Sequence, residues 1–202
     1  PRHYREVKPT ATVNAKGEDR IRGGHPWIYR SDVVDVADVE PGIIVRVLGP
    51  RRRELGHALF SDQSQITLRM ITRDDRAIDL AFWRERLECA IGFREILEID
   101  ATAYRLVHGE ADLLPSLVVD RYGDHLVIQT LSQGMDRLTA TLVPLLGELT
   151  GAQSVLARND PKVRQLEGLA QKVEAVHGAV PETIAVREAG VAYDVDPWRG
   201  QK

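Results

Sequence analysis

Apolar and polar positions alternate at close spacing through residues 10–72. The run "GIIVRVL" lies between two Pro/Gly pairs, and residues 51–60 are its expected hairpin partner. Further along, Ile66, Leu68 and Met70 face one side of a predicted strand, while Thr67 and Arg69 face the other. Several short strands with turns between them predict a small β-barrel or sandwich.

The period becomes helical at Leu80. Apolar residues then recur three or four positions apart, so we expect a helix from Leu80 to about residue 99 with Asp79 as its N-cap. A second helical pattern contains Leu138, Leu142, Leu145 and Leu149. Pro144 lies inside that second helix and predicts a kink or a break, because proline lacks the N–H that the helix requires.

The remaining patterns predict an α+β domain with a mainly antiparallel sheet. Three strand-like runs, "YRLVHGE", "SLVVDRY" and "HLVIQTL", lie between the two helices, and Gly123-Asp124 joins the last two as a tight turn. "SVLARND" predicts another strand, and "PKVRQLEGL" predicts a short helix that begins at Pro161 with Asp160 as cap. Residues 183–196 predict a hairpin that turns at Ala189-Gly190.

Composition indicates a soluble globular protein. The chain has 202 residues, of which 43% are hydrophobic and 28% charged, and 27 basic residues nearly balance 30 acidic ones. No run approaches the roughly 20 apolar residues of a membrane span, and the N-terminus lacks the apolar core of a signal peptide. The single cysteine, Cys89, excludes an internal disulfide. We therefore expect a cytoplasmic protein without membrane contact.

Most catalytic signatures are missing, and we predict no catalytic or metal-binding residue. The six histidines lack zinc-ligand spacing, and Cys89 is interpreted as a small buried side chain of the first helix. Acidic residues near His108 allow a metal or acid–base site, but an inter-strand turn with solvated acids and an Asp120–Arg121 ion pair is the favoured interpretation. The acidic residues concerned are Glu110, Asp112, Asp120 and Asp124. The pair Asn159-Asp160 allows the same choice, and helix capping suffices to explain it.

The segment "RIRGGHPWIYRSDV" is the best candidate for a binding surface. Gly23-Gly24 permits close backbone approach, Trp27 and Tyr29 offer stacking surfaces, and the neighbouring arginines can meet phosphate. The alternative is that Trp27 anchors the core beneath a glycine turn while the arginines are solvated. The residues alone leave these two interpretations open.

The chain resembles a known family along nearly its whole length. "GHPWIYRSDV", "PGIIVRVL" and "LGHALFSDQSQITLRMITRD" resemble the N-terminal PUA domain of bacterial large-subunit rRNA cytosine-C5 methyltransferases. "FWRERL", "YRLVHGEADLLPSLVVDRYGDHLVIQ" and "RNDPKVRQLEGL" resemble their central α+β domain, and "DVDPWRGQK" resembles the entry into their S-adenosylmethionine-binding domain. Leu113 and Ser116 depart from the pattern, because the family usually has glycine at both positions.

The resemblance implies a PUA-like β-barrel in residues 1–74 and a central α+β domain in residues 75–189. Residues 190–202 would be a linker into a Rossmann-like methyltransferase domain that is truncated here. The parent enzyme would transfer a methyl group from S-adenosylmethionine to C5 of a cytosine, after a cysteine thiolate attacks C6. Cys89 does not match that nucleophile's motif. The chain alone is therefore expected to recruit RNA, to bind no cofactor and to be inactive.

Structured RNA, and rRNA in particular, is the partner that the resemblance implies. The expected RNA contacts are Arg20, Arg22, Gly24, His25, Arg30, Arg51, Arg52 and Arg53. Gln201 and Lys202 would border the cofactor cleft. Three alternatives remain open: an RNA-binding module for another base or RNA, a small-molecule enzyme that uses His108, Asp112 or Asp120, and a homodimerisation domain.

Overall fold

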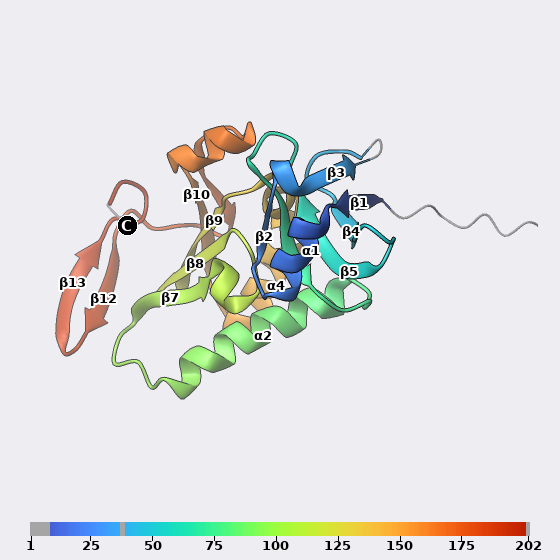
Figure 1. The fold of residues 1–202 in the computed structure, drawn as a ribbon. Helices are drawn as coiled ribbons and strands as arrows, with labels where there is room; N and C mark the ends of the chain where they lie inside the picture. The colour runs from blue at the N-terminus through green and yellow to red at the C-terminus, as the bar shows by residue number, and fades with distance from the viewer. Residues whose placement is uncertain (1–8, 37–38, 201–202) are drawn as a thin grey trace, which may run out of the picture. The chain divides into compact units, whose positions relative to one another are not determined.

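The computed structural model describes residues 9–36 and 39–200, and it divides the chain into two compact units (Figure 1). The boundary lies between Arg76 and Ala77, two residues beyond the predicted position. The functional roles assigned to the three predicted segments stay predictions. Gln201 and Lys202, the expected cofactor neighbours, lie outside the described residues.

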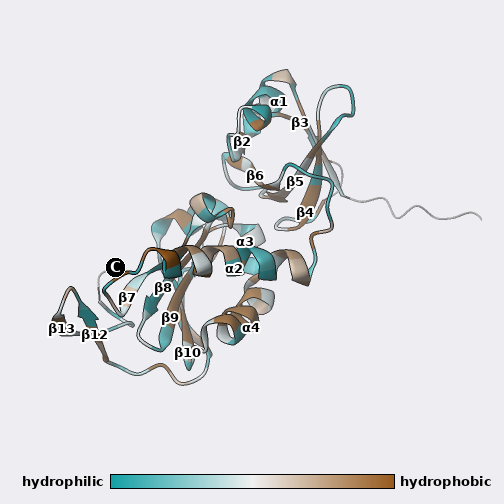
Figure 2. Cartoon of the chain, turned by 90° about the horizontal axis from the view of Figure 1, so that it is seen from below, coloured by the Kyte–Doolittle hydropathy of each residue, from teal (hydrophilic) through white to brown (hydrophobic). Residues whose placement is uncertain are grey.

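The first unit is built on one curled six-stranded sheet with the strand order β2-β6-β5-β4-β1-β3 (Figure 2). Its neighbouring strands are antiparallel except for the parallel pair β1–β4. Alternate side chains of β2 and most of β4 fill the interior, whereas side chains on both faces of β5 and β6 are buried. The fully buried core residues include Ile28, Val45, Val47, Ala58 and Leu68. The elements are β1 (Thr10–Val13), α1 (Ala15–Arg22), β2 (Trp27–Tyr29), η1 (Arg30–Asp32), β3 (Val33–Val36), β4 (Ile44–Leu48), β5 (Glu54–Phe60) and β6 (Ile66–Thr72).

Helix α1 was not predicted from the sequence, although its start and stop signals are both present. The side chain of Asn14 accepts a hydrogen bond from the backbone N–H of Gly17 at 2.9 Å, which caps the first turn. Gly17 also lets the helix lie close to β1, because a Cβ there would meet Cβ of Val13 at 2.9 Å. Only Gly17 and Ile21 of the helix are buried, so the apolar periodicity is too short to recognise.

Two glycines of the first unit have positive φ for different reasons, and their alanine variants should differ accordingly. Gly24 has a φ of +87°, but a Cβ there meets nothing within 4 Å. At Gly56, φ is +116° and a Cβ would lie 2.0 Å from the backbone oxygen of Thr72. We expect Gly24→Ala to cost about 1–2 kcal/mol of unfolding free energy, and Gly56→Ala more than about 3 kcal/mol because overpacking adds to the strain. Urea unfolding of both variants measures this difference, and equal losses would contradict the close β5–β6 packing.

The second unit places helices on one face of a five-stranded sheet with the order β11-β10-β9-β8-β7. The sheet is antiparallel except for the parallel pair β9–β10, which confirms the mainly antiparallel prediction. The elements are α2 (Leu80–Ile96), β7 (Ala103–His108), η2 (Gly109–Asp112), β8 (Leu117–Tyr122), β9 (His125–Thr130), α3 (Gln133–Arg137), α4 (Thr139–Thr150), β10 (Ser154–Asn159), η3 (Lys162–Glu167), β11 (Lys172–His177), β12 (Ile184–Glu188) and β13 (Val191–Val195).

The structure confirms several local predictions in this unit. Asp79 caps α2 by accepting a hydrogen bond from the N–H of Phe82 at 3.0 Å, and the helix ends at Ile96. Strands β8 and β9 are joined through the two-residue turn at Gly123-Asp124. The hairpin β12–β13 turns at Ala189 and Gly190, whose φ values of 46° and 82° fit a tight two-residue turn.

Three details differ from the predictions. Helix α4 continues past Pro144 to Thr150 without a break, and four of its apolar side chains are buried around that position. The segment after Pro161 is a 3₁₀ helix without a side-chain cap, because Pro161 itself is extended and the Asp160 carboxylate pairs with Arg158 at 2.9 Å. Cys89 is exposed, since the buried face of α2 consists of Phe82, Trp83, Leu87 and Ala90.

The turn between β7 and β8 requires left-handed backbone at both positions where the resembling family has glycine. Leu113 has a φ of 57° and Ser116 a φ of 61°. Leu113 and Ser116 therefore adopt the left-handed conformation that glycine would adopt without strain.

Replacing Leu113 with glycine should relieve this strain. The Leu113 side chain is 48% exposed, so little packing is lost, and we expect Leu113→Gly to raise the unfolding free energy by up to about 1 kcal/mol. Leu80→Gly, on another exposed leucine but with helical backbone, is the control and should lower it by about 1 kcal/mol. A stability loss in both variants would show that the turn is not strained at Leu113.

Candidate nucleic-acid interface

Gly23 and Gly24 of the first unit end helix α1, and the chain then continues into β2. The N–H of His25 donates to the carbonyl of Arg20 at 3.0 Å, and the N–H of Gly24 donates to that of Ile21 at 3.1 Å. This pair of bonds, with Gly24 in the left-handed region, is a Schellman motif. Gly24 is therefore required first by the helix end, and its surroundings are open.

An aromatic cluster follows on β2, formed by His25, Trp27 and Tyr29. The His25 ring lies 6.1 Å from the Trp27 ring and 6.3 Å from the Tyr29 ring, measured between centroids. Nδ1 of His25 lies 3.1 Å from the backbone nitrogen of Trp27, which fixes the orientation of the imidazole. Ile28 points into the core, whereas Trp27 and Tyr29 are only half-buried. The interpretation of Trp27 as the core anchor is therefore wrong, and Ile28 has that role.

Arg20 joins the aromatic cluster but is neutralised by a buried carboxylate. Its guanidinium carbon lies 5.0 Å from the centre of the Tyr29 ring, in a cation–π arrangement. Its Nε donates to Asp32 at 2.8 Å, and the Asp32 side chain is only 1% exposed. Arg20 thus holds η1 against α1, and its charge is largely used within the protein.

Glu18 connects helix α1 to the turn between β4 and β5. Its carboxylate pairs with Arg22 at 2.8 Å and with Arg53 at 3.1 Å. Arg51 and Arg52 are exposed beside Arg53 and form no ion pair within the described part of the chain. The structure therefore brings Arg22 and the Arg51–Arg53 turn together, and it leaves two arginines of this group with unneutralised charge.

Arg30 is engaged differently from the prediction. Its Nη2 donates to the backbone carbonyl of Asp62 at 2.6 Å and to that of Ser64 at 3.2 Å. Arg73, which the sequence did not single out, donates through Nε to the carbonyl of Ile21 at 3.0 Å, at the C-terminal end of α1. Both arginines stabilise loops. Helix α1 ends at Arg22, and the free carbonyls at the C-terminal end of a helix attract cations. Recognising this helix in the sequence would therefore have indicated that arginines can find acceptors there within the protein.

Two of the four acidic residues singled out in the second unit, Asp112 and Asp120, form ion pairs, whereas Asp124 is exposed in its turn and accepts from Gln153. Asp112 accepts from both terminal nitrogens of Arg94, at 2.6 Å and 2.8 Å, and both side chains are 9% exposed. Asp120 pairs with Arg105 at 2.8 Å across the β7–β8 ladder. The predicted Asp120–Arg121 pair is wrong, because adjacent residues of a strand point to opposite faces; Arg121 donates to the carbonyl of Gly123.

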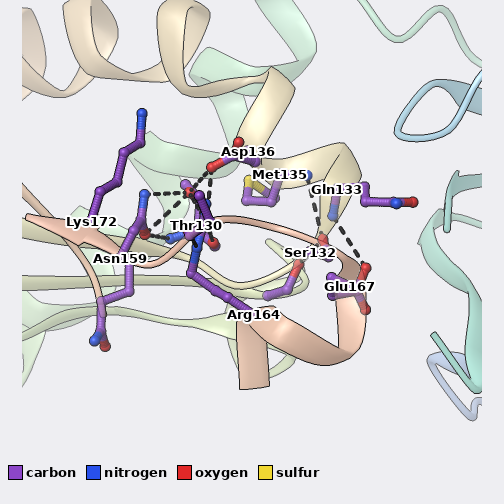
Figure 3. A network of polar contacts seen from close by, with 12 residues as sticks. Thr130, Ser132, Gln133, Met135, Asp136, Asn159, Arg164, Glu167 and Lys172 are labelled. Atoms are coloured by element: carbon purple, nitrogen blue, oxygen red, sulfur yellow. Dashed lines mark hydrogen bonds and ion pairs between the residues drawn. The ribbon is translucent and has the colours of Figure 1, made fainter. Parts of the chain in front are cut away.

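A buried polar network closes the carboxyl ends of β9 and β10 (Figure 3). Arg164 is 1% exposed, donates to the Thr130 carbonyl and pairs with Asp136 at 2.8 Å. Oδ1 of Asn159 accepts from the N–H of Thr130 at 2.8 Å. Asn159 is thus a buried structural residue, whereas Asp160 pairs with Arg158 nearer the surface. The network satisfies backbone groups where the parallel strands end.

Within residues 9–36 and 39–200, no group of three or more His, Cys, Asp and Glu side chains is arranged to hold a metal ion. No helix of that described part is both long and apolar enough to cross a membrane.

The first unit matches a known domain family by sequence. The model of the PUA-like domain family matches residues 11–73, which is almost the whole described part of the first unit. The first unit therefore carries a PUA-like domain, and the N-terminal part of the resemblance is confirmed.

Relatives align along nearly the complete chain. "Ribosomal RNA large subunit methyltransferase I" of Tolumonas auensis is 38% identical over 97% of this chain and 51% of its own length. The protein of the same name from Aliivibrio fischeri is 38% identical over 93% of this chain and 49% of its own length. The chain thus spans about half the length of the curated relatives it matches. Its homologues are rRNA large-subunit methyltransferases.

Solved structures show the same fold. A putative SAM-dependent methyltransferase from Streptococcus mutans has a TM-score of 0.79 at 16% identity, over 95% of this chain and 49% of the other. A putative methyltransferase complexed with SAH has the same TM-score over 96% of this chain. At 16% identity, and over about half of each solved chain, these matches show the fold alone, and they do not support the expectation that a methyltransferase domain is absent.

Removing Asp112 tests its assignment as a structural residue. Asp112→Ala should lower the unfolding free energy by about 3 kcal/mol, because it leaves the Arg94 guanidinium buried without its carboxylate. Asp124→Ala, at an exposed position of the same acidic segment, should change it by less than about 0.5 kcal/mol. Thermal and urea unfolding measure both variants. A fully stable Asp112→Ala variant would reopen a catalytic role.

Proposed function

We propose that this chain provides RNA recognition to a SAM-dependent methyltransferase that modifies C5 of a cytosine in large-subunit rRNA. The observation that carries the proposal is the pairing of an aromatic cluster with uncompensated arginines on a PUA-like unit. His25, Trp27 and Tyr29 offer ring surfaces, while Arg51 and Arg52 offer charge that no described carboxylate neutralises. The names of the homologues support rRNA as the substrate class.

The predicted contacts differ in what they can offer RNA. Arg51, Arg52 and Arg22 are exposed and are proposed to contact phosphate, with Arg22 first having to release Glu18. His25 and the open backbone at Gly24 are proposed to contact bases or sugars. Arg20, Arg30 and Arg53 are proposed to act mainly as supports, since each already has an acceptor in the protein.

The described residues do not themselves form a convincing cofactor site. Nucleotide-like ligands of open α/β sheets bind beyond the carboxyl ends of parallel strands. At the ends of β9 and β10 that space holds the Arg164 side chain, which is 1% exposed and fully engaged. These residues are therefore not proposed to take part in methyl transfer. SAM is proposed as the methyl donor of the whole protein.

Cys89 is not proposed as the cysteine that attacks C6. It lies exposed on α2, and its surrounding sequence does not match the motif expected for that nucleophile. Methyl transfer by the present chain alone is therefore not expected. Cytoplasmic location and a homodimer remain part of this proposal.

Binding of an rRNA hairpin to the 202-residue chain across a salt series tests RNA recognition. We expect affinity to fall steeply with salt, because each phosphate contact releases counterions. The variant Arg51→Gln/Arg52→Gln should reduce the slope of log K against log salt by about 2, which corresponds to two lost contacts.

A charge-matched variant of the second unit is the control. Arg84→Gln/Lys172→Gln removes the same charge from residues that pair with Glu148 and Glu174, and it should leave the slope nearly unchanged. If both double variants lower the slope equally, the interaction depends on net charge alone and not on the arginines of the β4–β5 turn. Absence of binding at low salt would overturn the proposal.

A further inference from the structure

The second unit has a pocket on the sheet face opposite its helices. The pocket has a volume of about 420 Å³ and is lined by Ala103, Tyr104, Arg105, His108, Asp120, Tyr122 and Tyr193. Pockets of this size accommodate small planar ligands.

A β-bulge assembles the floor of the pocket. Arg105 pairs in register with Asp120 and His108 with Val118, while the register shifts between Arg105 and Val107. The extra residue lets Leu106 and Val107 both point into the core, where they are 1% and 0% exposed. His108 therefore returns to the same face as Arg105, which regular alternation would not allow.

The hairpin β12–β13 forms the wall. It is held to the chain before β7 by hydrogen bonds from the N–H of Thr102 to the carbonyl of Arg187 at 2.8 Å and from the N–H of Ala189 to that of Asp100 at 2.9 Å. Figure 1 shows this hairpin beside β7. Tyr193 of β13 thereby reaches a pocket whose other residues come from β7 and β8.

The chemistry of the pocket favours a neutral ring over a free phosphate. The Arg105 charge faces Asp120 at 2.8 Å, so the floor is close to neutral. Tyr122 and Tyr193 supply aromatic surface, and Tyr193 remains 42% exposed although its hydroxyl donates to Glu188 at 2.9 Å. Burial raises the pKa of Tyr122, so its hydroxyl stays neutral and able to donate. The Arg105 and His108 side chains of this floor are exposed to solvent.

We infer that this pocket binds one unstacked nucleobase of an RNA strand, with Tyr193 as a stacking surface and the exposed Arg105 guanidinium, oriented by Asp120, as a donor to the base edge. The inference rests on the proposed function, because it adds a second contact for the same class of ligand. Aromatic rings beside hydrogen-bonding groups are how proteins hold single-stranded bases. A base bound here would be recognised without contacts from Arg51–Arg53 at the β4–β5 turn.

Variants of the exposed strand β13 test the stacking role. Tyr193→Ala should weaken binding of an rRNA hairpin with unpaired nucleotides about tenfold, whereas Tyr193→Phe keeps the ring and should retain most of the affinity. Val191→Ala is the matched control, because Val191 is 64% exposed on the same strand and does not line the pocket. Equal affinities of Tyr193→Ala and Val191→Ala, or equal losses in Tyr193→Ala and Tyr193→Phe, would overturn the stacking role.

Titration of the full chain with each of the four nucleoside monophosphates, followed by amide NMR, tests the pocket without the hairpin RNA. We expect shift changes in β7, β8 and β13 that disappear in Tyr193→Ala. Changes that map elsewhere, or none at millimolar concentration, would overturn the inference even if hairpin binding and its salt dependence are observed. Conversely, nucleotide binding in the pocket without any hairpin binding would leave the pocket in place and reject the proposed function.

Discussion

Buried carboxylates determine which arginines of this protein can meet a ligand. Asp32, Asp112 and Asp120 are nearly inaccessible, and each holds one guanidinium within 2.6–2.8 Å. A carboxylate removed from water is stable only with such a partner, so these pairs are fixed by the fold. Within the first unit, Arg51 and Arg52 at the turn between β4 and β5 are exposed and have no such carboxylate in the described residues. They are therefore the arginines that the proposed function assigns to phosphate contact.

The sequence predicted well those elements whose signals are local. The two-residue turns at Gly123-Asp124 and Ala189-Gly190 set the hairpin registers, and Asp79 precedes a long apolar period, so each was recognisable within a few residues. Helix α1 was missed because it buries only Gly17 and Ile21. Gly24 closes a Schellman motif at the end of this helix, a role that the sequence analysis did not assign, and its contact with RNA stays a prediction. For helix α4 the sequence predicted a kink or a break at Pro144. The helix instead continues to Thr150, because burial of its apolar side chains outweighs the cost of the proline.

The candidate site was predictable in outline but not in its partners. The residues around His25 do form a cluster, because β2 alternation places Trp27 and Tyr29 on one face. Which arginines stay available depends on contacts distant in sequence. Asp32 reaches Arg20 only after η1 folds back onto α1, and Glu18 meets Arg53 only when the β4–β5 turn packs against the helix. No short sequence motif indicates either of these two ion pairs.

In the proposed function, the two units offer RNA different kinds of contact, and this division has a consequence for specificity. Arg51 and Arg52 supply charge, which attracts any polyanion and weakens with salt. The rings at β2 and at the β7–β8 pocket lie beside arginines that carboxylates already neutralise, as Arg20 is by Asp32 and Arg105 by Asp120. Neutralisation lowers non-specific attraction there while keeping donors, acceptors and ring faces. Base recognition in this chain should therefore depend little on salt, so that discrimination between RNAs increases as the electrostatic contribution is screened.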